Sequence, residues 1–312
     1  MSGRPVILAG GSGFLGTLLA HELTARECPV IILSRRPCPS NGLIQQTGWD
    51  GRSLGPWTDC LNGAGAVINL TGRSVNCRPT QANRREIIDS RVNSVKILGE
   101  AIRRSPQPPY VFVQTGGEAI YGDYGDVSCD ENSPPGEGFL VETCRLWEEA
   151  FDDLTAPTVR KVLLRIGFVL DPRGGAMRTL ARLTKWGLGG SAGNGRQWIN
   201  WIHSADVVRI FLSSIERDHF QGLYNASGPN PATNNDFMRA LRSALRRPWS
   251  PPTPAWAVRL GARLMGTDPR LVLTGRRCLP KRLLEQDFQF AFPELPAALV
   301  HLLSRRTEAG TA

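Results

Sequence analysis

Short apolar runs alternate with helix-length amphipathic stretches in the first half of the chain. Residues 6–9 are continuously apolar, which predicts a buried strand, and residues 14–24 have the apolar spacing of a helix. Glycines separate these two segments, and a second apolar run follows at residues 30–33. This order of strand, glycine-rich turn, helix and strand predicts a βαβ unit.

The same alternation continues along the chain. Apolar runs typical of buried strands occur at residues 66–69, 111–113 and 162–165, and helix-length stretches lie near 84–104 and 139–154. Strands that alternate with helices favour a parallel sheet with both faces covered. We therefore expect the α/β class, with a doubly wound parallel sheet.

The pattern changes after about residue 171. Glycines cluster at residues 187–195 and prolines at 248–254, and helix-like runs lie near 234–245 and 255–266. This shift predicts a smaller C-terminal α/β module that covers one end of the sheet and binds substrate. The predicted division is a main domain at 1–170 with a returning segment at about 202–225, a smaller module at 171–201 and 226–303, and a tail at 304–312.

Composition narrows the class of protein. The 312 residues carry 37 Lys and Arg against 28 Asp and Glu, a formal net charge of +9. The basic residues are spread along the whole chain, so we expect no nucleic-acid partner. Most of them are arginines, whose planar guanidinium suits an anionic small molecule. No run approaches the roughly 18 apolar residues that a membrane helix needs, so we expect no membrane partner.

Cysteine usage points to a reducing compartment. The seven cysteines are odd in number and include no C-x-x-C pair. Neither a disulfide framework nor a metal site is predicted from this pattern. The first residues run straight into glycines without a signal-peptide cleavage site. We therefore expect a cytoplasmic protein.

The glycine-rich turn has the spacing of a dinucleotide-binding loop. Glycines stand at the first, fourth and seventh positions of the segment, directly after the predicted strand and before the predicted helix. Such glycines allow the tight turn, the close approach of a pyrophosphate and the packing of helix on strand. The alternative is a purely structural βα turn. The predicted cofactor-binding residues of this Rossmann-type loop are Gly10, Gly11, Ser12, Gly13, Phe14, Leu15 and Gly16.

The end of the second predicted strand indicates which cofactor binds. An acidic residue there would favour NAD, but the chain has Ser34, Arg35 and Arg36. Arginine cations match the 2′-phosphate of NADP(H), so NADP(H) is the predicted cofactor. The alternative is that both arginines merely face solvent.

These features resemble the extended short-chain dehydrogenase/reductase superfamily. The resemblance is stronger to its atypical epimerase-family branch, often labelled nucleoside-diphosphate-sugar epimerase or cell-division inhibitor. It covers nearly the whole chain and includes LAGGSGFLG (8–16), SRRP (34–37), AVINLTGR (66–73), SRVNSVKIL (90–98), FLVETCRLWE (139–148), LLRIGFVL (163–170), GLGGSAGNGRQWINWIH (187–203), PNPATNNDFMRAL (229–241) and CLPKRLLEQDFQF (278–290).

The resemblance implies further site residues and a homodimer. The dimer would form through the helices near 84–104 and 139–154. The stretch around His203 resembles one that the superfamily places where its two modules meet, although a structural histidine at a helix start is the alternative. The implied contacts along the ribose and nicotinamide half of the cofactor are Asn69, Leu70, Thr71, Gly72, Arg165 and Gly167.

The usual catalytic residues of the superfamily are missing. Ordinary members use a Ser, a Tyr and a Lys four residues after the Tyr, and the lysine lowers the pKa of the phenol. Here the lysine position holds Cys144, the serine position falls on Gly117, and a further polar position holds Arg91. Standard carbonyl reduction therefore lacks its proton donor.

Four side chains are candidate substitutes. Tyr121 could act as an acid, Thr115 could donate a hydrogen bond, Arg91 could stabilise an oxyanion, and Cys144 could act as a thiol acid or nucleophile. The alternative is that they fill space beside the cofactor or in the core. We expect Glu118 to be a surface carboxylate on the loop that follows, and a role as a base is the alternative.

The segment 187–203 combines glycines, a cation, amides and flat rings. Such a set can line a substrate pocket, and the predicted substrate contacts are Arg196, Trp198, Trp201 and His203. A crossing loop anchored by core tryptophans is the alternative.

Two functions fit these observations. The first is an NADP(H)-binding oxidoreductase or epimerase-like protein that acts on a small carbonyl or hydroxyl compound, including phosphorylated and nucleotide-linked sugars. The second is a non-catalytic NADP(H)-binding sensor or regulatory module. Loss of the acid/base residues favours the second, and the pocket-like segment favours the first.

Overall fold

A computed structural model of the chain describes residues 3–308. Its main sheet has seven strands in the order β11-β7-β5-β4-β1-β2-β3, and every neighbouring pair is parallel. The predicted α/β class with a doubly wound parallel sheet is confirmed. The strands are β1 (Val6–Ala9), β2 (Val30–Ser34), β3 (Ile44–Gly48), β4 (Ala66–Asn69), β5 (Val111–Gly117), β7 (Arg160–Ile166) and β11 (Gly222–Ala226).

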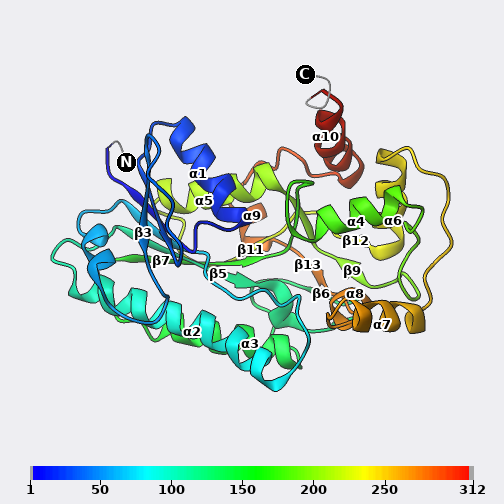
Figure 1. Cartoon of the computed structure of the whole chain (residues 1–312), viewed down its shortest axis with the longest axis horizontal. Coiled ribbons are helices and arrows are strands. Elements are labelled where there is room, and N and C mark those ends of the chain that lie inside the picture. The colour runs from blue at the N-terminus through cyan, green and yellow to red at the C-terminus, as the bar shows by residue number, and fades with distance from the viewer. Residues whose placement is uncertain (1–2, 309–312) are drawn as a thin grey trace.

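Helices cover both faces of this sheet (Figure 1). Helices α1 (Phe14–Ala25) and α5 (Ser204–Glu216) lie on one face, and α2 (Gln81–Arg104) and α3 (Phe139–Asp152) lie on the other. Within β1, Val6 and Leu8 pack with α1 and α5 in the first core cluster, whereas Ile7 packs with α2 and α3 in the second core cluster. Because successive strand residues point to opposite faces, covering both faces requires continuously apolar strands.

The order of the strands reverses next to β1. Ala9 at the end of β1 is level with Leu33 of β2 on one side and Asn69 of β4 on the other. On one side of β1 the chain continues to β2, and on the other side β4 leads on to β5. Because these two connections run in opposite directions, a crevice forms between them outside the carboxyl ends of the strands. The loops that follow β1 and β4 therefore meet at this crevice.

The remaining elements lie mostly to one side of the main sheet (Figure 1). Their strands form three small pairs, β8 with β10, β9 with β12, and β6 with β13. The division of the chain into two modules stays a prediction. The elements are β6 (Ser128–Cys129), β8 (Phe168–Leu170), α4 (Gly175–Lys185), β9 (Trp198–Ile199), β10 (Trp201–His203), β12 (Ala232–Thr233), α6 (Asn234–Ala244), α7 (Ala255–Leu264), α8 (Arg270–Leu273), β13 (Arg277–Cys278), α9 (Lys281–Glu285) and α10 (Leu295–Glu308).

Two features differ from the expectations. Strand β3 was not predicted, because its sequence IQQTG is polar and none of its residues is fully buried at the sheet edge. The tail expected from residue 304 is helical as far as Glu308, where α10 ends, and residues 309–312 lie outside the described part of the chain.

Candidate functional site

The glycines of the loop between β1 and α1 have different structural roles. Gly10 has φ +71°, and a Cβ added there would lie 2.8 Å from Thr71 Oγ1. A Cβ on Gly16 would lie 2.1 Å from the carbonyl oxygen of Gly11, so this glycine is required for the helix to pack on the loop. At Gly13 the nearest atom to an added Cβ is 3.6 Å away, so the fold leaves space there.

Other residues of the predicted loop pack against protein. The Phe14 ring lies against Gly174, where an added Cβ would come 2.4 Å from the ring. Leu15 and Leu70 both pack on the first core cluster, and the Gly11 position is closed by Leu8. Their side chains therefore shape the loop and leave its backbone to face the crevice.

Hydroxyl groups from two loops meet at the end of β2. Ser34 Oγ lies 3.4 Å from Ser12 Oγ and also accepts a hydrogen bond from the Arg36 backbone at 3.3 Å. The side chains of Arg35 and Arg36 are exposed, and neither takes part in an ion pair within residues 3–308. The arrangement fits a phosphate group, since hydroxyl donors lie beside two uncommitted cations.

Hydrogen bonds of Asn69 hold the loop after β4 in place, and the Thr71 hydroxyl of this loop has no partner among the described residues. Asn69 is buried and donates to Ser94 Oγ at 3.1 Å and to Gln114 Oε1 at 2.9 Å, while its Oδ1 accepts from the Thr71 backbone. Thr71 Oγ1 is buried and has no hydrogen-bond partner among the described residues. An orphaned hydroxyl beside Gly10 fits a polar ligand in the crevice.

Two candidate catalytic groups are engaged by backbone carbonyls. Arg91 Nη1 donates to the carbonyl oxygens of Arg73 and Ile87, both at 2.9 Å, and its guanidinium lies against Gly72. Thr115 Oγ1 donates to the Asn69 carbonyl at 2.8 Å. Both groups support the loop after β4, so neither hydrogen bond is directed at the crevice.

The predicted cofactor contact Arg165 forms a buried ion pair. Its Nε and Nη2 donate to the two carboxylate oxygens of Glu148 at 2.9 and 2.7 Å. The two side chains are only 8% and 10% exposed. Arg165 Nη1 also donates to Tyr121 Oη at 2.8 Å, so the whole guanidinium is used inside the protein.

Tyr121 lies at the centre of this network. Its side chain is fully buried, and its hydroxyl donates to Asn225 Oδ1 at 2.8 Å while it accepts from Arg165. Burial raises the pKa of Tyr121 well above the ordinary value of a phenol. A tyrosine held in this way is a poor proton donor at neutral pH unless both contacts break.

The fold brings Cys144 next to the position of the missing serine. A Cβ added at Gly117 would lie 3.6 Å from Cys144 Sγ. Burial, followed by the negative charge of Glu148, raises the pKa of the Cys144 thiol to about 12. The thiol is therefore almost entirely protonated at neutral pH and is a weak nucleophile.

The predicted substrate segment is partly structural. Trp201 is fully buried, and its Nε1 donates to the Asn230 carbonyl at 2.8 Å. His203 caps α5 by accepting from the Ala205 backbone at 2.9 Å, and its other nitrogen lies 3.0 Å from His301 Nδ1. These two residues belong to the core under the segment.

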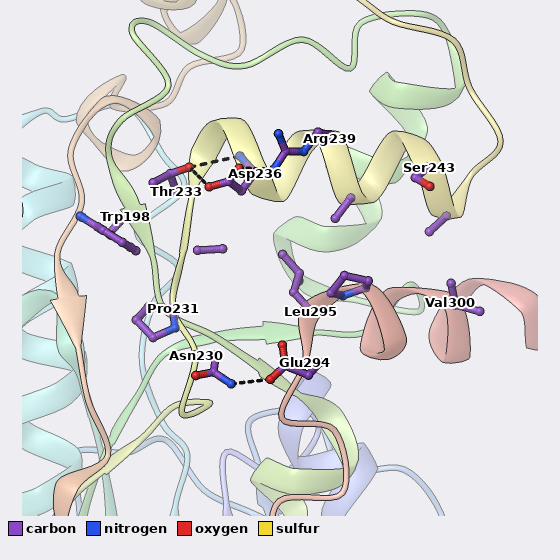
Figure 2. A pocket seen from close by; sticks show the side chains of 14 residues that line it. Trp198, Asn230, Pro231, Thr233, Asp236, Arg239, Ser243, Glu294, Leu295 and Val300 are labelled. Carbon is purple, nitrogen blue, oxygen red and sulfur yellow. Dashed lines mark hydrogen bonds and ion pairs between the residues drawn. The ribbon is translucent and has the colours of Figure 1, made fainter.

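The other two residues of that segment lie near the surface. Trp198 Nε1 donates to Asp126 Oδ1 at 2.9 Å, and exposed Arg196 forms an ion pair with Asp126 at 3.3 Å. Trp198 also lines a cavity of about 550 Å³ between α6 and the start of α10, together with Thr233, Arg239 and Leu295 (Figure 2). None of the residues that line this cavity belongs to the loops after β1, β4 or β5.

Glu118 was expected at the surface, and this expectation is wrong. It is the first residue after β5, and it is only 3% exposed. Its Oε1 and the Oγ of Ser227 are both buried without a hydrogen-bond partner in the described part of the chain. Burial raises the pKa of Glu118 to about 7. The position after a strand at the crevice edge was the available sequence signal, but burial of the carboxyl depends on distant segments.

Residues 3–308 contain neither a membrane-spanning helix nor a cluster of metal-ligating side chains. No helix there is long and apolar enough to cross a membrane. Within the same residues, no group of three or more His, Cys, Asp or Glu side chains could hold a metal ion.

Comparisons with known proteins identify the class. Residues 6–140 match the NAD dependent epimerase/dehydratase family, and residues 253–302 match a domain of unknown function, DUF1731. A crystal structure of the human epimerase family protein SDR39U1 (isoform 2) with NADPH has a TM-score of 0.87 and 32% identity, covering 96% of this chain and 99% of that one. The predicted NAD(P)-binding Rossmann fold of an extended short-chain dehydrogenase/reductase is confirmed.

Full-length relatives define the particular family. Human SDR39U1 is 33% identical over 304 residues, covering 96% of this chain and 99% of its own. The Arabidopsis thaliana homologue, described as chloroplastic, is 31% identical over 94% of this chain and 85% of its own. A nucleoside-diphosphate sugar epimerase from Corynebacterium glutamicum is 28% identical, with a TM-score of 0.79 over 97% of this chain and 59% of that one. The chain belongs to the epimerase family that includes SDR39U1.

Proposed function

We propose that the chain is an NADP(H)-dependent oxidoreductase that acts on a small carbonyl or hydroxyl compound. The observation that carries the proposal is the arrangement at the crevice, where Gly13 leaves space, the Thr71 hydroxyl has no partner among the described residues, and Ser12 meets Ser34. Arg35 and Arg36 would hold the 2′-phosphate of the cofactor. The NADPH bound by human SDR39U1 supports the same assignment.

Nucleotide-linked sugars and phosphorylated carbonyl compounds are the substrates to test first. The Corynebacterium glutamicum structure is named as a nucleoside-diphosphate sugar epimerase, which supports this choice. We also propose a homodimer and a cytoplasmic location. The seven cysteines are all free thiols in the structure, as suits a reducing compartment.

Cofactor selection is tested by replacing Arg35 and Arg36 together with alanine. We expect NADPH affinity to fall about 30-fold, from about 2 kcal/mol of lost charge-assisted contacts, while NADH affinity stays nearly unchanged. The matched control is the exposed pair Arg103 and Arg104 at the end of α2, because the same two charges are removed far from β2. Equal losses for NADPH and NADH would contradict the role of the arginines. Fluorescence titration measures both affinities.

A second function, an NADP(H) sensor without catalysis, is favoured by one observation. The hydroxyls of Tyr121 and Thr115 and the guanidinium of Arg91 are committed to hydrogen bonds inside the protein, and the Cys144 thiol is buried with a raised pKa. The two functions are separated by single-turnover oxidation of bound NADPH against a panel of carbonyl compounds and nucleotide sugars. Oxidation by any member supports the enzyme, and tight binding without oxidation across the panel supports the sensor.

A further inference from the structure

Glu118 lies where the main sheet meets the segments that follow it. It directly follows Gly117, the last residue of β5, and a Cβ added at Gly167 would lie 3.0 Å from Glu118 Oε2. The same Cβ would lie 2.6 Å from the Asn200 carbonyl and 3.2 Å from Ser227 Cβ. The carboxyl is therefore enclosed by segments that are distant in the sequence, and its Oε1 is unpartnered within residues 3–308.

The position relative to the crevice places Glu118 on the nicotinamide side. In this kind of sheet each half binds one mononucleotide, and the crevice separates the halves. Arg35 and Arg36 after β2 mark the adenosine half. The nicotinamide half then lies over the carboxyl ends of β4, β5 and β7, and Glu118 and Gly167 are the first residues after two of these strands.

We propose that Glu118 exchanges a proton with the substrate and so replaces the missing tyrosine and lysine. This inference rests on the proposed oxidoreductase function. In the oxidation direction, the carboxylate accepts the hydroxyl proton as the C–O bond becomes C=O. In reduction, the carboxylic acid returns that proton to the carbonyl oxygen. NADP(H), when bound, accepts or supplies the hydride at the same carbon, so protons and electrons balance.

The surroundings of Glu118 suit this role. Burial raises the pKa to about 7. The Ser227 and Asn200 side chains and the Arg276 cation face the carboxyl and partly oppose that rise, without a hydrogen bond of normal geometry to Oε1. The Glu131 carboxylate raises the pKa further, and the buried Cys278 thiol also faces this group. A carboxyl with this pKa populates both protonation states near neutral pH, as an efficient acid and base requires.

The rival groups lack these properties. The Tyr121 hydroxyl already has two hydrogen-bond partners, and the Cys144 thiol has a pKa of about 12. Glu118 combines an unpartnered oxygen with a neutral-range pKa at the end of β5.

The first test uses the charge of the nicotinamide ring, and it needs no substrate. NADP⁺ and NADPH differ by one positive charge on this ring, so an ionised carboxylate nearby favours NADP⁺. We expect the ratio of NADP⁺ to NADPH affinity to rise at least about threefold between pH 6 and pH 8, because a carboxylate and the nicotinamide cation attract each other in the weakly screened protein interior. In Glu118→Gln the ratio should stay flat. The 2′-phosphate titrates in both cofactors and cancels in the ratio.

The second test measures turnover. In Glu118→Gln, the single-turnover rate should fall about 100-fold or more with NADPH affinity preserved, and the ionisation near pH 7 should vanish from the rate profile. Glu118→Asp should restore part of the rate and the pH dependence. Glu285→Gln is the matched control, because Glu285 is an exposed carboxylate on α9.

The outcomes separate the two proposals. A wild-type affinity ratio that is independent of pH would overturn the role of Glu118, whether or not a substrate is found. Turnover within threefold of wild type in Glu118→Gln would also overturn it and leave the oxidoreductase function standing. Failure of the wild-type protein to bind either cofactor would overturn the proposed function and this inference together.

Discussion

The buried ion pair between Glu148 and Arg165 makes a sharp prediction about stability. Replacing Glu148 with alanine removes both acceptors of a bidentate contact at 2.9 and 2.7 Å. The Arg165 cation then stays in the protein interior, and among residues 3–308 only the Tyr121 hydroxyl still accepts a hydrogen bond from it. Breaking a buried pair by removing one partner costs about 3 to 5 kcal/mol, because the remaining charge is desolvated and uncompensated. Side-chain exposures of 8% and 10% place this pair in that class.

The neighbouring residue supplies the control. Glu149 forms an ion pair with Arg145, but these side chains are 50% and 43% exposed. Solvent screens such a pair, so Glu149→Ala should cost no more than about 0.5 kcal/mol. Both variants remove one carboxylate from α3, and they differ mainly in burial.

The assay is urea unfolding followed by tryptophan fluorescence and far-UV circular dichroism. The free energy of unfolding at zero urea should fall by about 3 kcal/mol or more in Glu148→Ala relative to Glu149→Ala. A difference below about 1 kcal/mol would refute the reasoning, because Arg165 would then have another stabilising partner. If Arg165 instead contacts the cofactor, Glu148→Ala would change NADPH affinity with little loss of stability.

Three further predictions follow from named contacts. Gly13→Val should abolish cofactor binding and leave the melting temperature nearly unchanged. Gly16→Val should unfold the protein, because its Cβ would lie 2.1 Å from a backbone oxygen. Thermal melts with and without NADPH distinguish these two variants. Cys144→Ala should leave turnover and NADPH affinity within about threefold of wild type, since its thiol stays protonated, and loss of turnover alone would contradict this. Because the pKa of Glu118 is raised to about 7, the folded state holds its proton more tightly than the unfolded state. Wild-type stability should therefore fall by about 3 kcal/mol relative to Glu118→Gln as pH rises from about 4.5 to about 7, and equal pH profiles would contradict the buried titration.

Local sequence patterns determined the frame of the site. The apolar run of β1, the glycine spacing after it and the apolar period of α1 are all contained within residues 6–25, so they predict the strand, the loop and the helix together. Strand β3 was missed because its polar sequence carries little periodic signal at the sheet edge. The absence of the usual Tyr and Lys was equally visible in the sequence, because it depends only on which residues occupy two known positions.

The tertiary structure alone decided what the candidate side chains contact. Arg165 could face the cofactor or the interior from the end of the same strand, and the choice depends on Glu148 from α3. Glu118 is buried because Asn200 and Ser227 come from segments more than 80 residues further along the chain. Hydrophobic periodicity reports only which face of an element is covered, whereas the partner of a polar group is set by segments that meet after folding.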